Sequence, residues 1–331
     1  MAVLVPCHNE GASIVGVVSD FRRHLPNAEI YVYDNNSQDD TATLASGAGA
    51  RLRREPLQGK GNVVRRMFSD VEADIYVLVD GDGTYDAASA PEMIRMLLQD
   101  RLDMVNGARV SNHKGAYRRG HRTGNIVLSG FVARIFGNRI TDMLSGYRVF
   151  SRRFVKSFPA LSSGFEIETE LTVHALELRV PLGEVPTPYS ERADGGVSKL
   201  RTYTDGLRIL RTIVWLIKQE RPLQFFSIAS VLLFLSGIAL FVPVLLEYER
   251  TGLVPRLPTA ILSMGIVLLS FLSLACGLVL DSVALGRREA KRMVYLSIPF
   301  VPWTAEKPSD STAAAMSVVE PMVEELRVSN P

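Results

Sequence analysis

The sequence predicts an α/β domain with a mostly parallel sheet, followed by two transmembrane helices. Short apolar runs typical of strands alternate with segments of helical spacing between residues 2 and 109. Polar and acidic side chains gather where these strands end. Two apolar runs, residues 223–246 and 258–280, contain no charged side chain and follow later in the chain.

The expected elements alternate regularly along the chain. Apolar residues at positions 14, 17, 18 and 21 share one face of the first helix. Strand–helix–strand units connect with a right-handed crossover, so we expect parallel strands with helices on both faces of the sheet. The expected strands are residues 2–6, 29–34, 50–53, 75–79 and 103–109, and the expected helices are residues 13–25, 41–48, 58–68 and 90–99.

The stretch I-Y-V-L-V-D-G-D-G-T-Y-D, residues 75–86, joins a buried strand to an acidic turn. Asp80 and Asp82 stand at the carboxyl end of this strand, where open α/β sheets bind ligands. Two carboxylates there suit Mg²⁺ or Mn²⁺ that carries a diphosphate. The motif alone leaves a loop with two solvated aspartates as the alternative.

The other strand ends also carry polar side chains. They are His8, Asn9 and Glu10 after the first strand, Asp34 and Asn35 at the second, and Arg109 at the last. Parallel topology brings these ends to one edge of the sheet. Neither G-x-G-x-x-G nor G-x-x-x-x-G-K-[S/T] follows the first strand, which disfavours a dinucleotide cofactor and a P-loop ATPase.

Composition narrows the class of protein further. A chain of 331 residues forms one large domain or two smaller ones, and its formal net charge of +2 does not argue for a nucleic-acid partner. Cys7 and Cys276 are the only cysteines. We therefore expect neither a disulfide framework nor a structural zinc site, and a reducing compartment fits.

Each apolar run is long enough to cross a hydrocarbon core of ~30 Å as a helix. Basic residues flank the pair on both outer sides, so the positive-inside rule places both flanks in the cytoplasm, at the inner face of the cytoplasmic membrane. The expected division is a cytoplasmic domain (1–200), an amphipathic juxtamembrane helix (201–221), two transmembrane helices with a short external loop (222–282) and a flexible cytoplasmic tail (283–331). A soluble α/β domain with a buried apolar tail is the alternative.

Seven motifs in order carry a resemblance to a known family. They are P-C-H-N-E (6–10), Y-D-N-N-S-Q-D-D-T (33–41), Q-G-K-G-N (58–62), D-G-D-G-T-Y-D (80–86), G-N (124–125), T-D-M-L-S-G-Y-R-V-F (141–150) and G-F-E-I-E-T-E-L (164–171). This series resembles the inverting nucleotide-sugar transferases of glycosyltransferase family two, whose fold is called GT-A. Over residues 2–210 it is most similar to the polyprenyl-phosphate branch, which includes dolichol-phosphate mannose synthases and bactoprenol glucosyltransferases.

The resemblance implies that one sugar moves from a UDP- or GDP-sugar to polyprenyl phosphate with the help of Mg²⁺ or Mn²⁺. Carried over by position, Pro6, His8 and Glu10 line the base and ribose pocket, and Asp34 contacts the base. Lys60 lies near the diphosphate. Asp80 and Gly81 face the ribose or metal, and Asp82 ligates the metal. The residues after Asp82 depart from the family's usual pattern, which leaves the sugar undetermined.

The acceptor side is expected between Arg109 and Arg148. Arginine forks match phosphate oxygens, and a lipid phosphate with a second pKa of about 6 needs no strong base. The basic residues assigned to it are Arg109, Arg118, Arg119 and Arg122, with Arg148 shaping the pocket and Ser198 and Lys199 in a glycine-rich closing loop. A solvated loop is the alternative for the basic run. Asp142 is the candidate base if the acceptor is a hydroxyl. Glu166 and Glu168 contact sugar hydroxyls or fix an arginine, with a structural role as the alternative.

Two other functions stay open at this point. One is transfer to a hydroxyl acceptor on a glycolipid or polysaccharide, although the Q-x-x-R-W motif of processive synthases is missing. The other is a non-catalytic scaffold that binds nucleotide sugar or lipid. The oligomeric state is open as well, a homo-oligomer included.

Overall fold

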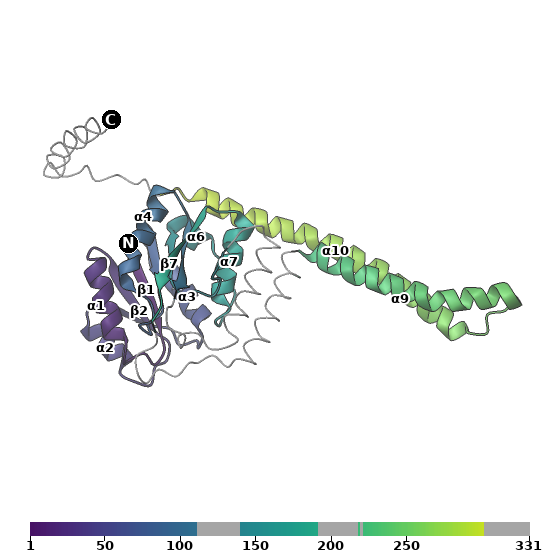
Figure 1. The fold of residues 1–331 in the computed structure, drawn as a ribbon, viewed down its shortest axis with the longest axis horizontal. Helices are drawn as coiled ribbons and strands as arrows, with labels where there is room; N and C mark the ends of the chain where they lie inside the picture. The colour runs from purple at the N-terminus through teal and green to yellow at the C-terminus, as the bar shows by residue number, and fades with distance from the viewer. Residues whose placement is uncertain (111–139, 191–217, 219–220, 301–331) are drawn as a thin grey trace, which may run out of the picture. The chain divides into compact units, whose positions relative to one another are not determined.

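The computed structural model describes residues 1–110, 140–190, 218 and 221–300, and all elements given below lie within them. The centre of the N-terminal domain is a seven-stranded sheet with the order β3-β2-β1-β4-β6-β5-β7 (Figure 1). Its strands are β1 (Ala2–Cys7), β2 (Glu29–Asp34), β3 (Arg51–Arg54), β4 (Ile75–Leu78), β5 (Met104–Val110), β6 (Arg148–Ser151) and β7 (Leu182–Pro188). Only β6 runs antiparallel to its neighbours, so the expected mostly parallel α/β sheet is confirmed.

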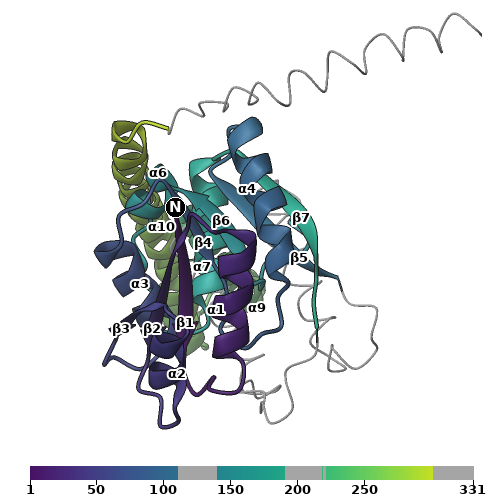
Figure 2. The ribbon, with the colours of Figure 1, turned by 90° about the vertical axis from the view of Figure 1, so that its left-hand side faces the viewer.

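Helices cover both faces of this sheet because its strands alternate their apolar side chains between the faces. Val3 and Val5 of β1 pack with α1 (Ile14–His24), α2 (Thr41–Gly47) and α4 (Ala90–Gln99). A short 3-10 helix, η1 (Ala87–Ser89), directly precedes α4. Ala2 and Leu4 face the opposite layer, made by α3 (Lys60–Asp70), α6 (Arg152–Ser157) and α7 (Ile167–Leu178). Figure 2 shows the sheet between these two layers.

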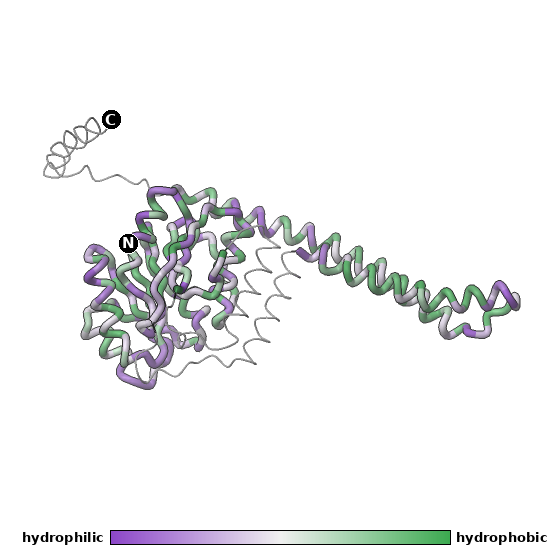
Figure 3. Tube along the Cα trace, in the orientation of Figure 1, coloured by the Kyte–Doolittle hydropathy of each residue, from purple (hydrophilic) through white to green (hydrophobic). Residues whose placement is uncertain are grey.

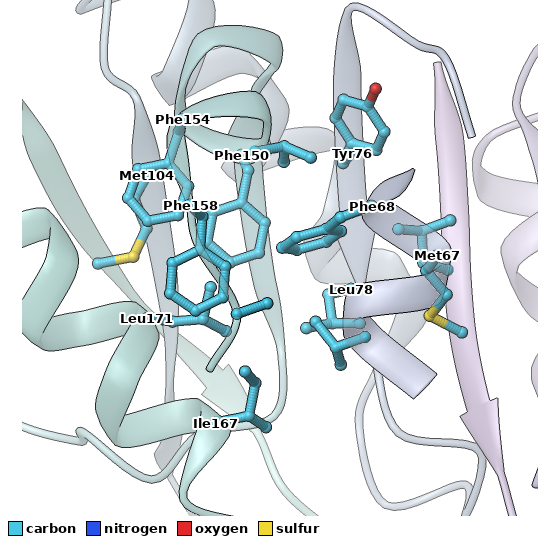
Figure 4. Close-up of a cluster of buried hydrophobic side chains, with 14 of the residues drawn as sticks. Met67, Phe68, Tyr76, Leu78, Met104, Phe150, Phe154, Phe158, Ile167 and Leu171 are labelled. Carbon is cyan, nitrogen blue, oxygen red and sulfur yellow. The ribbon is translucent and has the colours of Figure 1, made fainter. Parts of the chain in front are cut away.

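The second layer is anchored by a group of aromatic side chains. Phe150 of β6 and Phe154 of α6 stack with their ring centroids 4.9 Å apart, and Phe68 of α3 meets Phe150 edge-on (Figure 4). Phe150 and Phe154 are fully buried. Burial of such rings contributes a large share of core stability, and it fixes α3 and α6 against the sheet.

Two long helices follow this domain, α9 (Pro222–Thr251) and α10 (Leu257–Ser297). Both are long and apolar enough to cross a membrane, and Figure 3 shows the apolar residues along them. They pack along a seam of small residues, where the Ser230 and Ser270 hydroxyls lie 3.1 Å apart and Gly237 admits Val267. Most of their other large apolar side chains are exposed, as expected for helices that face lipid.

The C-terminal end of α10 differs from the expected flexible tail that begins at residue 283. No proline interrupts the chain between Pro258 and Pro299, and the helix continues to Ser297. Its last turns pack on α6 and α7, where Lys291 forms an ion pair of 2.7 Å with Glu177 and Tyr295 lies against the core. The expected amphipathic helix 201–221 and residues 301–331 lie outside the described part, apart from Lys218 and Arg221.

Candidate active site

The carboxyl ends of β1, β2 and β4 lie together because these strands are neighbours in the sheet. The Asn35 N–H donates to the carbonyl oxygen of Cys7 (2.8 Å), and His8 Nδ1 lies 2.9 Å from the carbonyl oxygen of Asn35. Asp34 pairs with Cys7 in the register of the two strands, and Pro6 is buried within β1. The sequence-predicted nucleotide residues Pro6, His8 and Asp34 therefore share one edge.

The loops that follow β1 and β2 are bound to each other. The Asn9 N–H donates to Ser37 Oγ (2.9 Å), and the Gln38 N–H donates to Asn9 Oδ1 (2.7 Å). The Glu10 N–H donates to Thr41 Oγ1 (2.8 Å) at the start of α2. These bonds place Glu10 near the other residues predicted to bind the nucleotide, and they join the two loops.

The acidic turn after β4 is held from three directions. Asp82 is buried, and its Oδ1 accepts hydrogen bonds from the Thr84 hydroxyl (2.7 Å) and the Thr84 N–H (3.2 Å). The Ser13 hydroxyl donates to the carbonyl oxygen of Gly81 (2.7 Å). A Cβ on Gly81 would lie 2.5 Å from Cys7 Sγ, so this close passage of two strand ends requires glycine.

Asp80 lies over a buried lysine that joins two carboxylates. The Lys60 ammonium donates to Asp80 Oδ1 and to Glu168 Oε1. The side chains of Lys60, Glu168 and Asp80 are 9%, 8% and 29% exposed, so Asp80 is the member open to solvent. Burial opposes the charged form of Lys60, but the two carboxylates outweigh burial and raise its pKa. Burial also raises the pKa of Glu168, while Lys60 opposes that rise.

The start of α3 explains why a lysine stands at a helix N-terminus. A cation at a helix N-terminus opposes the helix dipole, and Asp80 and Glu168 supply anionic partners for Lys60 from within the chain. The N–H groups of Gly61 and Asn62 donate to the carbonyl oxygens of Gly164 (3.1 Å) and Ser163 (3.3 Å). These carbonyls cap the first turn of the helix, and contact of Lys60 with a diphosphate stays a prediction.

Arg109 and Asp142 form a two-pronged ion pair. Arg109 Nε and Nη2 donate to Asp142 Oδ2 (2.7 Å) and Oδ1 (2.8 Å), and the Arg109 N–H also reaches Oδ2 (3.2 Å). The Arg109 guanidinium lies 5.5 Å from the ring centroid of Tyr189, which lies 5.2 Å from the ring of Tyr85. The predicted acceptor arginine is thus present at the edge of the sheet, and its position is fixed by a carboxylate and an aromatic ring.

The Asp142 carboxylate, the candidate base, is engaged by neighbouring side chains. Arg109 engages both of its oxygens, while Glu184 accepts from the N–H groups of Thr141 (3.0 Å) and Asp142 (3.3 Å). This arrangement holds the segment before β6 in place. Glu184 lies in β7 and Tyr189 directly follows it, and neither was predicted because no motif in this stretch indicates chemistry.

Arg148 requires a correction. The sequence assigns it to the acceptor pocket, but its side chain is fully buried in β6. Its guanidinium donates to the carbonyl oxygens of Met143 (2.6 Å) and Ser145 (3.0 Å) and to the Thr172 hydroxyl (2.9 Å). Burial lowers its pKa to about 10, although Glu168 and other nearby acidic groups oppose this. Arg148 braces the segment beside the site from the inside and does not line it.

Five other predicted residues lie outside the described part of the chain, and their places stay predictions. They are Arg118, Arg119, Arg122, Ser198 and Lys199.

Asp80 and Asp82 fit a divalent ion that arrives with a diphosphate. Among the described residues no three histidine, cysteine, aspartate or glutamate side chains form a cluster that could hold a metal by themselves. Magnesium, however, is commonly held by one or two carboxylates together with substrate phosphates. Gly146 lies beside Asp80 Oδ2, and a Cβ there would collide with that oxygen. The chain therefore keeps space around the more exposed carboxylate.

Comparison with known proteins agrees with this geometry. A sequence model of the family described as "Glycosyl transferase family 2" matches residues 2–158. Glycosyltransferase AglJ of Haloferax volcanii is 32% identical over 299 residues, which cover 89% of this chain and 98% of AglJ. The dolichyl-phosphate hexose transferase of the same organism is 28% identical over 221 residues, covering 67% of this chain and 95% of that protein.

The fold is also shared with a solved enzyme. The glucosyl-3-phosphoglycerate synthase of Mycobacterium tuberculosis superposes with a TM-score of 0.52 at 22% identity, covering 66% of this chain and 78% of that one. Its likeness identifies the domain as GT-A. From the strand-end carboxylates, the matched sequence model and the near full-length similarity to AglJ, we conclude that the chain belongs to glycosyltransferase family 2.

Proposed function

We propose that this protein moves one sugar from a nucleotide-sugar donor to a polyprenyl phosphate at the cytoplasmic face of the membrane, with inversion at the anomeric carbon. The observation that carries the proposal is α10, which has the length and composition to cross a membrane and whose last turns pack on the catalytic domain. An enzyme held to a bilayer in this way suits an acceptor that is itself embedded in lipid. The relative named for dolichyl-phosphate hexose transfer supports the same acceptor class.

The donor would bind across the ends of β1, β2 and β4. His8 and Asp34 would hold the nucleoside, and Asp80 and Asp82 would hold Mg²⁺ or Mn²⁺ with the diphosphate. The solved neighbour contains Mn²⁺ and UDP, which supports a divalent ion here. When bound, such an ion stabilises the negative charge of the departing nucleoside diphosphate.

The acceptor would approach from the side of Arg109. A lipid phosphate is largely dianionic at neutral pH and attacks without a strong base, so positioning is the main task of the protein. Arg109 already occupies both oxygens of Asp142, the nearest candidate base, which favours a phosphate acceptor over a hydroxyl. The phosphate site would be completed by residues outside the described part of the chain, Arg118, Arg119, Arg122, Ser198 and Lys199.

The test is a panel of radiolabelled UDP- and GDP-sugars with the purified full-length protein, Mg²⁺ or Mn²⁺ and a short polyprenyl phosphate. We expect label from one donor to enter the organic phase as an acid-labile lipid phosphate sugar. A labelled product on a hydroxyl-bearing glycolipid, with none on polyprenyl phosphate, would establish the other acceptor class.

A non-catalytic scaffold is tested with Asp82→Asn, which keeps the size of the side chain. We expect transfer to fall at least about 100-fold while the melting temperature stays close to wild type, because a metal ligand is lost and the turn is kept. Asp86→Asn, on the cap of η1, is the matched control and should retain activity. Equal rates for Asp82→Asn and wild type would support the scaffold.

A further inference from the structure

Lys60 is shared between Asp80 at the end of β4 and Glu168 on α7. We infer that Glu168 is a positioning residue for the divalent-ion site, because it binds Lys60 and thereby keeps that ammonium from neutralising Asp80 alone. This inference rests on the proposed function, since it takes Asp80 to receive the ion and the donor diphosphate.

Lys60, Asp80 and Glu168 together carry a net charge of −1, which attracts a cation. An ion that binds Asp80 competes with Lys60 for the same carboxylate. With Glu168 present, Lys60 keeps one buried anionic partner after the ion has arrived. Without Glu168, Lys60 and Asp80 would form a neutral pair, and the ion would have to break it and leave a buried ammonium unpaired, which is costly.

The backbone on both sides of Lys60 lies close to the segment that precedes α7. Gly59 has a φ of 128°, and Gly61 lies so close to the Ser162 carbonyl oxygen that a Cβ would collide with it. The Gly61 N–H donates to the Gly164 carbonyl oxygen (3.1 Å), just before α7 begins. The turn that carries Lys60 is therefore joined to the segment just before the helix that carries Glu168, and the ammonium lies between its two carboxylates.

Glu168 also differs from a carboxylate that only supports the fold. Its Oε2 is buried without a hydrogen-bond partner among the described residues. Glu170, two positions later on α7, uses both of its oxygens to accept the N–H groups of Leu161 and Ser162, each at 2.8 Å. A buried oxygen left unsatisfied costs stability, so Glu168 is poorly explained by folding alone.

The experiment titrates the full-length protein with Mn²⁺ in the presence of UDP and measures binding by calorimetry. We expect Glu168→Gln to raise the dissociation constant for Mn²⁺ about 10- to 100-fold. The double variant Lys60→Met/Glu168→Gln should return toward the wild-type value, since the competing ammonium is gone. Glu170→Gln is the matched control and should lower the melting temperature without changing Mn²⁺ affinity.

Three outcomes would overturn the inference. They are wild-type affinity in Glu168→Gln, no recovery in the double variant, and weaker Mn²⁺ binding in Lys60→Met, which tests the competition without changing Glu168. A melting scan of each variant tests whether it folds. If Glu168→Gln does not fold, Lys60→Met still tests the competition between Lys60 and the ion. Failure of the wild-type protein to bind Mn²⁺ with UDP would instead overturn the proposed function.

Discussion

The Asp142 carboxylate accepts two parallel hydrogen bonds from the Arg109 guanidinium, 2.7 Å from Nε and 2.8 Å from Nη2. Their side chains are only 8% and 17% exposed, so water screens this ion pair little. The pair ties the end of β5 to the segment that enters β6. Its charge balance therefore contributes to both the shape and the stability of this side of the site.

We expect Asp142→Asn to destabilise the protein by about 3–5 kcal/mol, because Arg109 would keep a buried charge without its counterion. Thermal unfolding in detergent measures the change. The double variant Arg109→Met/Asp142→Asn should lose less than the sum of the single variants, as expected for two residues in contact. Unchanged stability with abolished transfer would instead identify Asp142 as a base.

Gly146→Ala should reduce transfer far more than it reduces stability. Its new Cβ would collide with Asp80 Oδ2 and push that carboxylate away from the donor side. Rates with the lipid acceptor and a melting scan measure the two effects. Gly16→Ala on α1 is the control, because a Cβ there meets nothing within 4 Å. Equal activity in both variants would show that the position of Asp80 is unimportant.

His174 makes stability depend on pH. It is buried against Phe154 and Phe158, and burial, with the charge of Lys291, lowers its pKa to about 3. An unfolded histidine titrates near 6.5, so below that pH the unfolded chain binds a proton that the folded chain does not. Stability should therefore fall by up to about 1.4 kcal/mol per pH unit as the pH drops from about 6.5 towards 3.

The pH dependence is tested with His174→Gln, which should show a shallower loss of melting temperature between pH 6.5 and 5. Ser157→Ala removes only the hydroxyl that lies 3.3 Å from His174 Nε2 and should keep the wild-type slope. Parallel slopes for wild type and His174→Gln would place the acid sensitivity elsewhere.

Tyr295→Phe should loosen the end of α10 from the catalytic domain. The Tyr295 hydroxyl donates to Asp103 Oδ2 (2.6 Å), a fully buried carboxylate, and Arg153 lies 4.8 Å from the tyrosine ring centroid. Loss of a hydrogen bond to a charged group costs about 1.5–3 kcal/mol. Hydrogen exchange should rise in the last turns of α10, while Tyr248→Phe, on exposed α9, should leave it unchanged.

The sequence was sufficient for most of the fold because local patterns determine it. β2 and α4 have the predicted bounds, and the other predicted strands and helices of the first 109 residues differ by one or two residues at their ends. Two strands were not predicted: β6, which pairs antiparallel with both β4 and β5, and β7, which lies at one end of the strand order. Such pairings join residues far apart in the chain, so no local periodicity reports them.

The site was less completely predictable. Topology alone places Asp34, Asp80 and His8 at one edge, since parallel strands end together. Tertiary packing decides which charged side chains form ion pairs with one another. The sequence predicts that Arg148 shapes the acceptor pocket, yet its side chain is fully buried in β6. Glu168 lies 108 positions from Lys60, and no spacing rule joins them.

The unbroken course of α10 has a mechanical consequence. Its 41 residues extend about 60 Å at 1.5 Å per residue, roughly twice the ~30 Å of a hydrocarbon core. A rod that ends on Asp103 and Glu177 passes any tilt of its apolar half on to the sugar-handling domain. For a chain that spans the membrane as proposed above, bilayer thickness sets such tilt and would therefore change how far the reacting groups stand from the lipid surface.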